Sequence, residues 1–132
     1  MIKFFIFGHP NILSTHRNTL EFTKDSHLTK NGDCIVGVRA TYDIYSLMKS
    51  FNEGDELTVI IKGGGITETI HCIYNPKFSD KNEMVIRRSD FDSQRTLGIR
   101  ADRVAIDLDR ELIKYLQSPD NKAEVIIDEK TK

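Results

Sequence analysis

The sequence has no tryptophan, only two cysteines and no apolar segment long enough to cross a bilayer. A membrane helix needs about 20 apolar residues, and the apolar stretch at 4–7 is too short for the core of a signal peptide. Cys34 and Cys72 are too few for a disulfide framework and lack C-x-x-C spacing, so we expect reduced thiols in a cytoplasmic protein. The lack of tryptophan gives little support for stacking on single-stranded nucleic acid.

The chain also lacks a charge imbalance, because 19 basic residues stand against 20 acidic ones and the formal net charge is −1. This balance argues against a protein that coats nucleic acid or an anionic membrane by bulk charge. Of the 132 residues, 39% are hydrophobic and 30% are charged, which is an ordinary globular mixture. We therefore expect one domain over residues 1–132, large enough to form a core without disulfides or metals.

Short alternating apolar segments separated by turn residues predict a β-rich fold. We expect strands at 3–7, 16–23, 34–39, 57–62, 66–74, 84–88, 96–100 and 123–128. Two short helices are expected at 44–52 and 109–117, capped by Asp43 and Asp109. No alternating β-α-β rhythm is present. The predicted fold class is mainly β (α+β by content), a barrel or jelly-roll-like sandwich of about eight mostly antiparallel strands.

Gly32-Asp33 and Gly54-Asp55 each precede an expected strand, which is a weak sign of an internal sequence repeat. Gly-Asp turns of this kind recur in cradle-type barrels. The dipeptide is a common one, so we interpret the two copies as a coincidence.

Several short motifs occur together, in a fixed order, along nearly the whole chain. They are Gly8-His9-Pro10-Asn11, Thr15-His16-Arg17-Asn18-Thr19-Leu20-Glu21, Gly32-Asp33-Cys34-Ile35, Arg87-Arg88-Ser89-Asp90, Arg95-Thr96-Leu97 and Arg100-Ala101-Asp102. This ordered set resembles the archaeal domain-of-unknown-function family numbered 371, from which Arg103 is a mild departure because a lysine is expected there. The resemblance implies an archaeal cytosolic setting and a jelly-roll-like β fold. It implies no activity, so no catalytic residue is carried over.

Titratable side chains are concentrated between residues 8 and 37, which contain three of the four histidines and one cysteine. His9, His16 and Cys34 follow or begin expected strands, and imidazole and thiolate are the ligands that a transition metal such as zinc prefers. They are our candidate metal ligands, although their spacing matches no recognised motif. The alternative makes His9 a turn residue, His16 a hydrogen-bonding residue and Cys34 a small core residue.

The same residues are candidates for catalysis. Cys34 could form a thiolate–imidazole pair with His16 or His9, and Asp33 or Glu21 could orient the ring. The alternation that Cys34 shares with Val36 favours an inert core thiol instead. His16 and Glu21 could act together as acid and base, but on a regular strand they would face opposite sides, so a bulge would be needed.

Five arginines between residues 87 and 103 are interleaved with aspartates. Guanidinium groups bind phosphate at two points, and Arg88 is expected on a core-facing side with Met84 and Ile86. The alternative is a structural Arg–Asp network. Our predicted ligand-binding residues are His9, Arg17, Asn18, Arg88, Ser89, Arg95 and Thr96.

We therefore predict a small cytosolic protein that binds a small anionic, phosphorylated ligand in a polar cleft, with an enzymatic role left open. The alternative is a nucleic-acid or ribonucleoprotein accessory module without catalysis. That alternative predicts a continuous positive stripe from Arg17, Lys24, Lys30, Arg39 and the arginines at 87–103. We expect no membrane association, and the sequence carries no signal for an oligomeric state.

Overall fold

The computed structural model describes residues 1–130 of the protein. Its strands are β1 (Ile2–Phe7), β2 (Thr19–Thr23), β3 (Ile35–Gly37), β4 (Glu56–Gly63), β5 (Ile66–Tyr74), β6 (Glu83–Arg87), β7 (Thr96–Ile99) and β8 (Lys122–Glu129). The helices are α1 (Ile44–Ser50), α2 (Arg110–Tyr115) and a 3-10 turn, η1 (Ala105–Asp107). No helix within the described residues is both long and apolar enough to cross a membrane.

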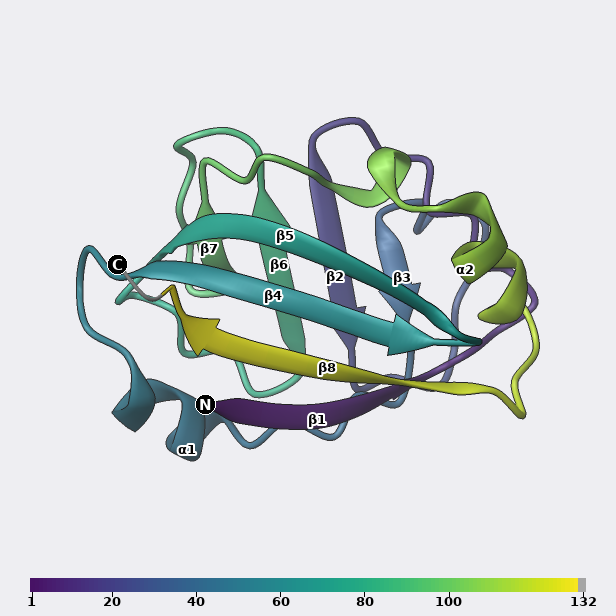
Figure 1. The fold of residues 1–132 in the computed structure, drawn as a ribbon, viewed down its shortest axis with the longest axis horizontal. Helices are drawn as coiled ribbons and strands as arrows, with labels where there is room; N and C mark the ends of the chain where they lie inside the picture. The colour runs from purple at the N-terminus through teal and green to yellow at the C-terminus, as the bar shows by residue number, and fades with distance from the viewer. Residues whose placement is uncertain (131–132) are drawn as a thin grey trace.

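The strands form one eight-stranded sheet in the order β1-β8-β4-β5-β7-β6-β2-β3, folded into two layers (Figure 1). The layers join where Ile73 pairs with Ile99 and, at the other edge, where Phe7 forms an antiparallel bridge to Val38. This second joint closes the sheet into a flattened barrel. The β2–β3 and β6–β7 pairs are parallel, whereas the other neighbours are antiparallel. The predicted class, mainly β with mostly antiparallel strands and two short helices, is confirmed.

The core lies between the two layers because alternate residues of each strand point inward. On β2, Leu20 and Phe22 are fully buried, as the alternation predicts. Phe22 packs edge-to-face on Phe4, with ring centroids 5.8 Å apart, and Phe4 packs in the same way on Tyr42. The other side chains of β2, including that of Glu21, therefore point to the outside of the barrel.

The two halves of the chain have the same structure. The two Gly-Asp dipeptides in the sequence do not mark this repeat. Asp109 caps α2 as Asp43 caps α1, 66 positions earlier. The same offset of 66 relates β4 to β8. It also relates Phe7 to Ile73 and Glu56 to Lys122, so the Phe7–Lys122 pair of one copy corresponds to the Ile73–Glu56 pair of the other. Backbone hydrogen bonds correspond as well: Gly8 N donates to Asn121 O, and Tyr74 N donates to Asp55 O, both at 2.9 Å. The chain is therefore a tandem structural repeat.

The repeat extends through the parallel strand pairs with slightly smaller offsets. β3 and β7 each contain a glycine whose added Cβ would overlap the opposing strand, 2.5 Å from Ile6 at Gly37 and 2.4 Å from Cys72 at Gly98. Two residues after each glycine stands an arginine in the left-handed region, Arg39 with φ of 50° and Arg100 with φ of 53°. Glycine is needed in both copies because the two layers meet there.

The repeats are interleaved rather than separate. β1 pairs with β8 of the second repeat, and β5 pairs with β4 of the first. A pseudo-twofold axis passes between Glu21 and Val85 on one layer and between Ile60 and Ile126 on the other, because each of these pairs joins corresponding residues. Neither repeat can therefore complete its strand pairing without its neighbour.

The interleaving predicts that a circular permutant retains the fold. The Met1 amino group lies 3.7 Å from the Asp128 carboxylate, in the place that corresponds to the Gly64–Gly65 turn between β4 and β5. Joining the C-terminus to Met1 with a short glycine linker and opening the chain between Gly64 and Gly65 should give a cooperatively unfolding protein with a native-like circular dichroism spectrum. A control opened inside β2 at Glu21 should not fold, because it interrupts the strand pairing on the axis. A permutant opened at Gly64 that is as unfolded as this control would contradict the repeat.

Candidate functional site

The outward side of β2 and β6 carries a group of polar side chains that we call the Glu21 face. Its members are Thr19, Glu21, Cys34, Arg87, Arg95 and Thr96. Thr19 pairs with Arg87 and Glu21 pairs with Val85, so side chains of β2 and β6 lie side by side. Cys34 and Arg95 occupy corresponding positions in the two repeats, since the carbonyl of each accepts a hydrogen bond from the axis residue, Glu21 or Val85. The face therefore lies across the pseudo-twofold axis.

Glu21 is a buried carboxylic acid at the centre of this face. Only 6% of the residue is exposed, and its side chain accepts one hydrogen bond within the described residues, from Cys34 Sγ at 3.9 Å. The pKa of Glu21 is raised to about 7, first by burial and then by the charge of Glu83, while Arg95 opposes the shift. Because Val85 fills the corresponding position, the fold does not require an acid here. Glu21 can gain or lose a proton near neutral pH.

Cys34 is a protonated donor rather than a thiolate. Burial, reinforced by the charge of Glu21, raises the pKa of the thiol to about 11. β3 begins only at Ile35 and its pairing with β2 shifts register, so Cys34 faces Glu21 instead of the core side expected from Val36. Within residues 1–130 Cys34 forms no thiolate–imidazole pair, because its hydrogen bond goes to the Glu21 carboxyl group.

Arg87 differs from the other arginines of its group. Four of them are paired with acids within residues 1–130: Arg88 with Asp107, Arg95 with Glu83, Arg100 with Asp90 and Arg103 with Glu68. These pairs are the structural network that the sequence offered as an alternative. Arg87 makes no ion pair within the described residues. Its Nε donates to Thr96 Oγ1 at 2.8 Å and its guanidinium lies 4.8 Å from the centre of the Phe91 ring.

Arg87 is therefore the functional candidate that our residue predictions missed. Burial, together with the nearby charge of Arg95, lowers the pKa of Arg87. A half-buried arginine beside another arginine is costly unless it meets an anion. The period-two pattern of β6 gave the signal, because Arg87 alternates with Ile86 and so faces outward beside Thr19.

The structure brings together His16, Arg17, Asn18 and Arg88, just before β2 begins. Arg88 N donates to Asn18 O at 2.9 Å, and Arg88 Nε donates to Arg17 O at 3.4 Å. The core-facing orientation expected for Arg88 is wrong, because β6 ends at Arg87 and the Arg88 side chain is 43% exposed. Ser89 lies beyond it, where its carbonyl accepts a hydrogen bond from Arg100 N.

His16 precedes β2, which begins at Thr19 rather than at residue 16. Its Nδ1 accepts hydrogen bonds from the backbone amides of Asn18 and Thr19, both at 3.1 Å. The ring therefore closes a turn at the start of the strand and stands beside the Thr19 hydroxyl, 3.1 Å away. The bulge expected between His16 and Glu21 is not needed, because His16 lies outside the regular strand.

His9 has a structural role in the turn that follows β1. Its Nδ1 accepts a hydrogen bond from Asn11 N at 3.0 Å, and in the second repeat Asn75 Oδ1 accepts one from Lys77 N at 3.1 Å. Among the residues that the structure describes, no three His, Cys, Asp or Glu side chains are grouped so that they could hold a metal ion. The candidate ligands His9, His16 and Cys34 are therefore not brought together.

The repeat predicts which substitutions His9 tolerates. His9→Asn should retain the wild-type melting temperature, because Asn75 already forms the same turn with its amide oxygen. His9→Ala should lose about 1 kcal/mol, the usual value of one intramolecular hydrogen bond. Chemical denaturation of both variants measures the difference. If both variants lose the same free energy of unfolding, the stability of the turn depends on the imidazole ring of His9 and not on its hydrogen-bond acceptor.

The buried position of Glu21 predicts a pH-dependent stability. The usual pKa of 4.5 applies to the unfolded chain and about 7 to the folded one, so folding weakens as pH rises through this interval because the unfolded chain ionises first. Glu21→Gln cannot ionise. It should match wild type at pH 4 and exceed it by up to roughly 3 kcal/mol above pH 7.

Urea denaturation across this pH range measures the effect. Glu111→Gln, an exposed change on α2, serves as the control and should follow wild type at every pH. Parallel curves for wild type and Glu21→Gln would mean that Glu21 titrates normally.

The comparisons with known proteins agree with the resemblance seen in the sequence. The family model described as "Domain of unknown function (DUF371)" matches residues 4–130. Over 120 residues the chain is 36% identical to the uncharacterized protein MJ0206 of Methanocaldococcus jannaschii, an alignment that covers 83% of this chain and 86% of that protein. The predicted family is thereby confirmed, and the chain belongs to the DUF371 family of archaeal proteins.

Proposed function

We propose that the protein binds a small phosphorylated anion on the Glu21 face, with Arg87 as its main contact. The observation that carries the proposal is the contrast among the arginines. Four arginines between residues 88 and 103 have carboxylate partners, whereas Arg87 has none within the described residues. Its guanidinium is held in place by Thr96 and Phe91, so two of its nitrogens are available for a two-point contact with phosphate.

The neighbours of Arg87 suit a phosphate as well. Thr19 stands directly opposite Arg87 on β2, and its hydroxyl can rotate away from His16 Nδ1 to donate its proton to a phosphate oxygen. Arg95 adds positive charge at the same face, although Glu83 offsets part of it. His16, beside Thr19, can donate from Nε2 because its Nδ1 acts as an acceptor.

Glu21 would make this binding depend on pH. When protonated, its carboxyl group can donate a hydrogen bond to an anion; when ionised, it repels one. Since the pKa of Glu21 is about 7, affinity should fall as pH rises from 6 to 8. If the face is catalytic, Glu21 is its acid or base, because the best catalytic pKa lies near the working pH.

No specific observation favours the nucleic-acid alternative. Four of the seven arginines that would form its positive stripe are paired with acids, and the net charge is −1. A cytosolic location is part of our proposal, supported by two cysteines that both carry free thiols.

The proposal predicts that Arg87→Met abolishes binding of inorganic phosphate or pyrophosphate. Titration calorimetry at pH 6 with the full chain measures it, and Arg100→Met is the matched control because its exposed pair with Asp90 lies elsewhere. Wild type should bind more weakly at pH 8, and Glu21→Gln should remove most of that pH dependence. Unchanged affinity in Arg87→Met, or equal loss in Arg100→Met, would refute this site.

A further inference from the structure

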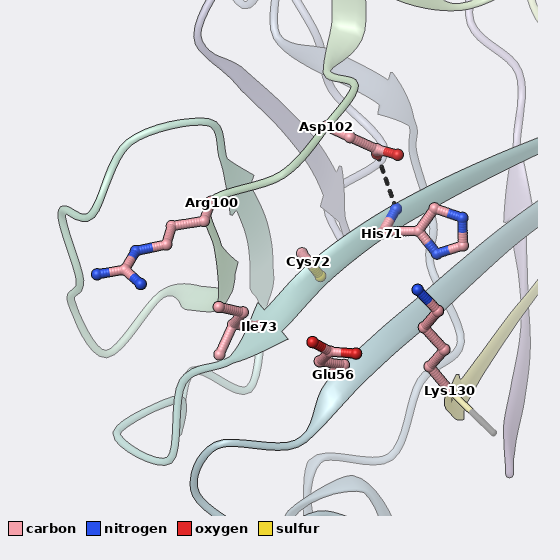
Figure 2. A pocket seen from close by; sticks show the side chains of 7 residues that line it. All are labelled: Glu56, His71, Cys72, Ile73, Arg100, Asp102 and Lys130. Atoms are coloured by element: carbon pink, nitrogen blue, oxygen red, sulfur yellow. Dashed lines mark hydrogen bonds between the residues drawn. The ribbon is translucent and has the colours of Figure 1, made fainter. Parts of the chain in front are cut away.

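A second polar feature lies apart from the Glu21 face. A hollow of about 220 Å³ opens beside β4 and β5, lined by Glu56, His71, Ile73, Asp102 and Lys130 among others (Figure 2). It shares no residue with the Glu21 face. None of its residues is among our predicted site residues, although His71 is the fourth histidine of the chain.

The internal repeat provides a comparison for these residues, because Phe5 corresponds to His71 and Thr41 to Asp102. Thr41 Oγ1 accepts a hydrogen bond from Phe5 N at 2.9 Å, and Asp102 Oδ1 accepts one from His71 N at 2.8 Å. The return bonds, from Thr41 N to Phe5 O and from Asp102 N to His71 O, are both 3.0 Å. A threonine can therefore accept the hydrogen bond from the backbone amide at this position. The second carboxylate oxygen of Asp102 is not needed for that bond.

The position of Glu56 shows how the hollow arises. Its counterpart 66 positions later is Lys122 of β8, whose ammonium nitrogen lies 4.6 Å from the centre of the Phe5 ring on β1. That lysine covers the aromatic ring. Where β4 pairs with β5, the shorter Glu56 side chain and His71 replace this lysine and phenylalanine, and both line the hollow (Figure 2). The repeat therefore gives no structural reason for Glu56, His71 or Asp102 at these positions, since Lys122, Phe5 and Thr41 occupy the corresponding ones.

The charges in the hollow are of both signs and are not matched to one another. Glu56, Asp102 and Lys130 make no ion pair within residues 1–130, whereas the nearby Arg100 is neutralised by Asp90. Two carboxylates repel a phosphate, but they suit an ammonium group. Lys130 suits a carboxylate, and Ile73 provides an apolar wall.

We propose that this hollow binds a small zwitterion of the α-amino acid class. The ligand's ammonium lies between Glu56 and Asp102, its carboxylate contacts Lys130, and its side chain packs on Ile73. His71 borders the ligand and can accept a hydrogen bond from the ammonium group. This site is independent of the anion site proposed on the Glu21 face.

The test is a titration of the full chain with each standard L-amino acid at millimolar concentration, followed by amide NMR. At least one amino acid should shift the His71 and Ile73 resonances. Glu56→Gln and Lys130→Met should each weaken its binding about tenfold or more, because each removes one charge-assisted contact. Glu111→Gln and Lys114→Met, exposed charge-matched changes on α2, should leave it unchanged.

A double variant, His71→Phe with Glu56→Lys, installs on β5 and β4 the pair that Phe5 and Lys122 form on β1 and β8. It should fold normally and bind no amino acid, because the lysine then covers the ring as Lys122 covers Phe5. The proposal is overturned if no amino acid shifts these resonances. It is also overturned if Glu56→Gln binds as tightly as wild type, or if acetate or methylammonium alone binds as tightly as the amino acid.

Discussion

The close approach of the two layers at Gly37 and Gly98 is the constraint on which the rest of the structure depends. A Cβ at either position would overlap a side chain of the opposing strand, Ile6 or Cys72. At these two joints the layers exchange hydrogen bonds, between Phe7 and Val38 and between the ends of β5 and β7. A sheet closed in this way leaves no long unpaired edge. The closure also fixes the positions of β2 and β6, whose outward sides carry the polar face.

Interleaving of the repeats puts a buried acid, Glu21, on the pseudo-twofold axis. Val85 shows that an apolar side chain fits this position, yet its partner Glu21 is a carboxylic acid with a pKa of about 7. Burial of an ionisable group without a strong partner lowers stability at neutral pH. A chain that retains such a residue where valine suffices gives up stability there, which is common at functional sites.

The internal repeat allows residues that the fold requires to be distinguished from residues that it does not require. Where both copies perform the same task, as His9 and Asn75 do in their turns, the fold accounts for the shared hydrogen bond. Where one copy is apolar and the other polar, as with Phe5 and His71, the polar residue needs another explanation. The comparison needs no second protein, because each repeat serves as the reference for the other.

The sequence alone determined the features that depend on neighbouring residues. Alternation put Leu20 and Phe22 in the core, and Asp43 and Asp109 were correctly identified as helix caps. The ordered motifs indicated the family.

The tertiary structure alone decided which charges meet. The Arg88 side chain does not point inward as expected, because β6 ends one residue earlier than predicted. Glu21 is buried by strands that are distant in the sequence, such as β6. Periodicity is a local property, whereas burial and ion pairing depend on strand register between segments far apart along the chain. For the same reason the repeat became visible only in three dimensions, since its copies share hydrogen bonds and strand pairing more than they share residues.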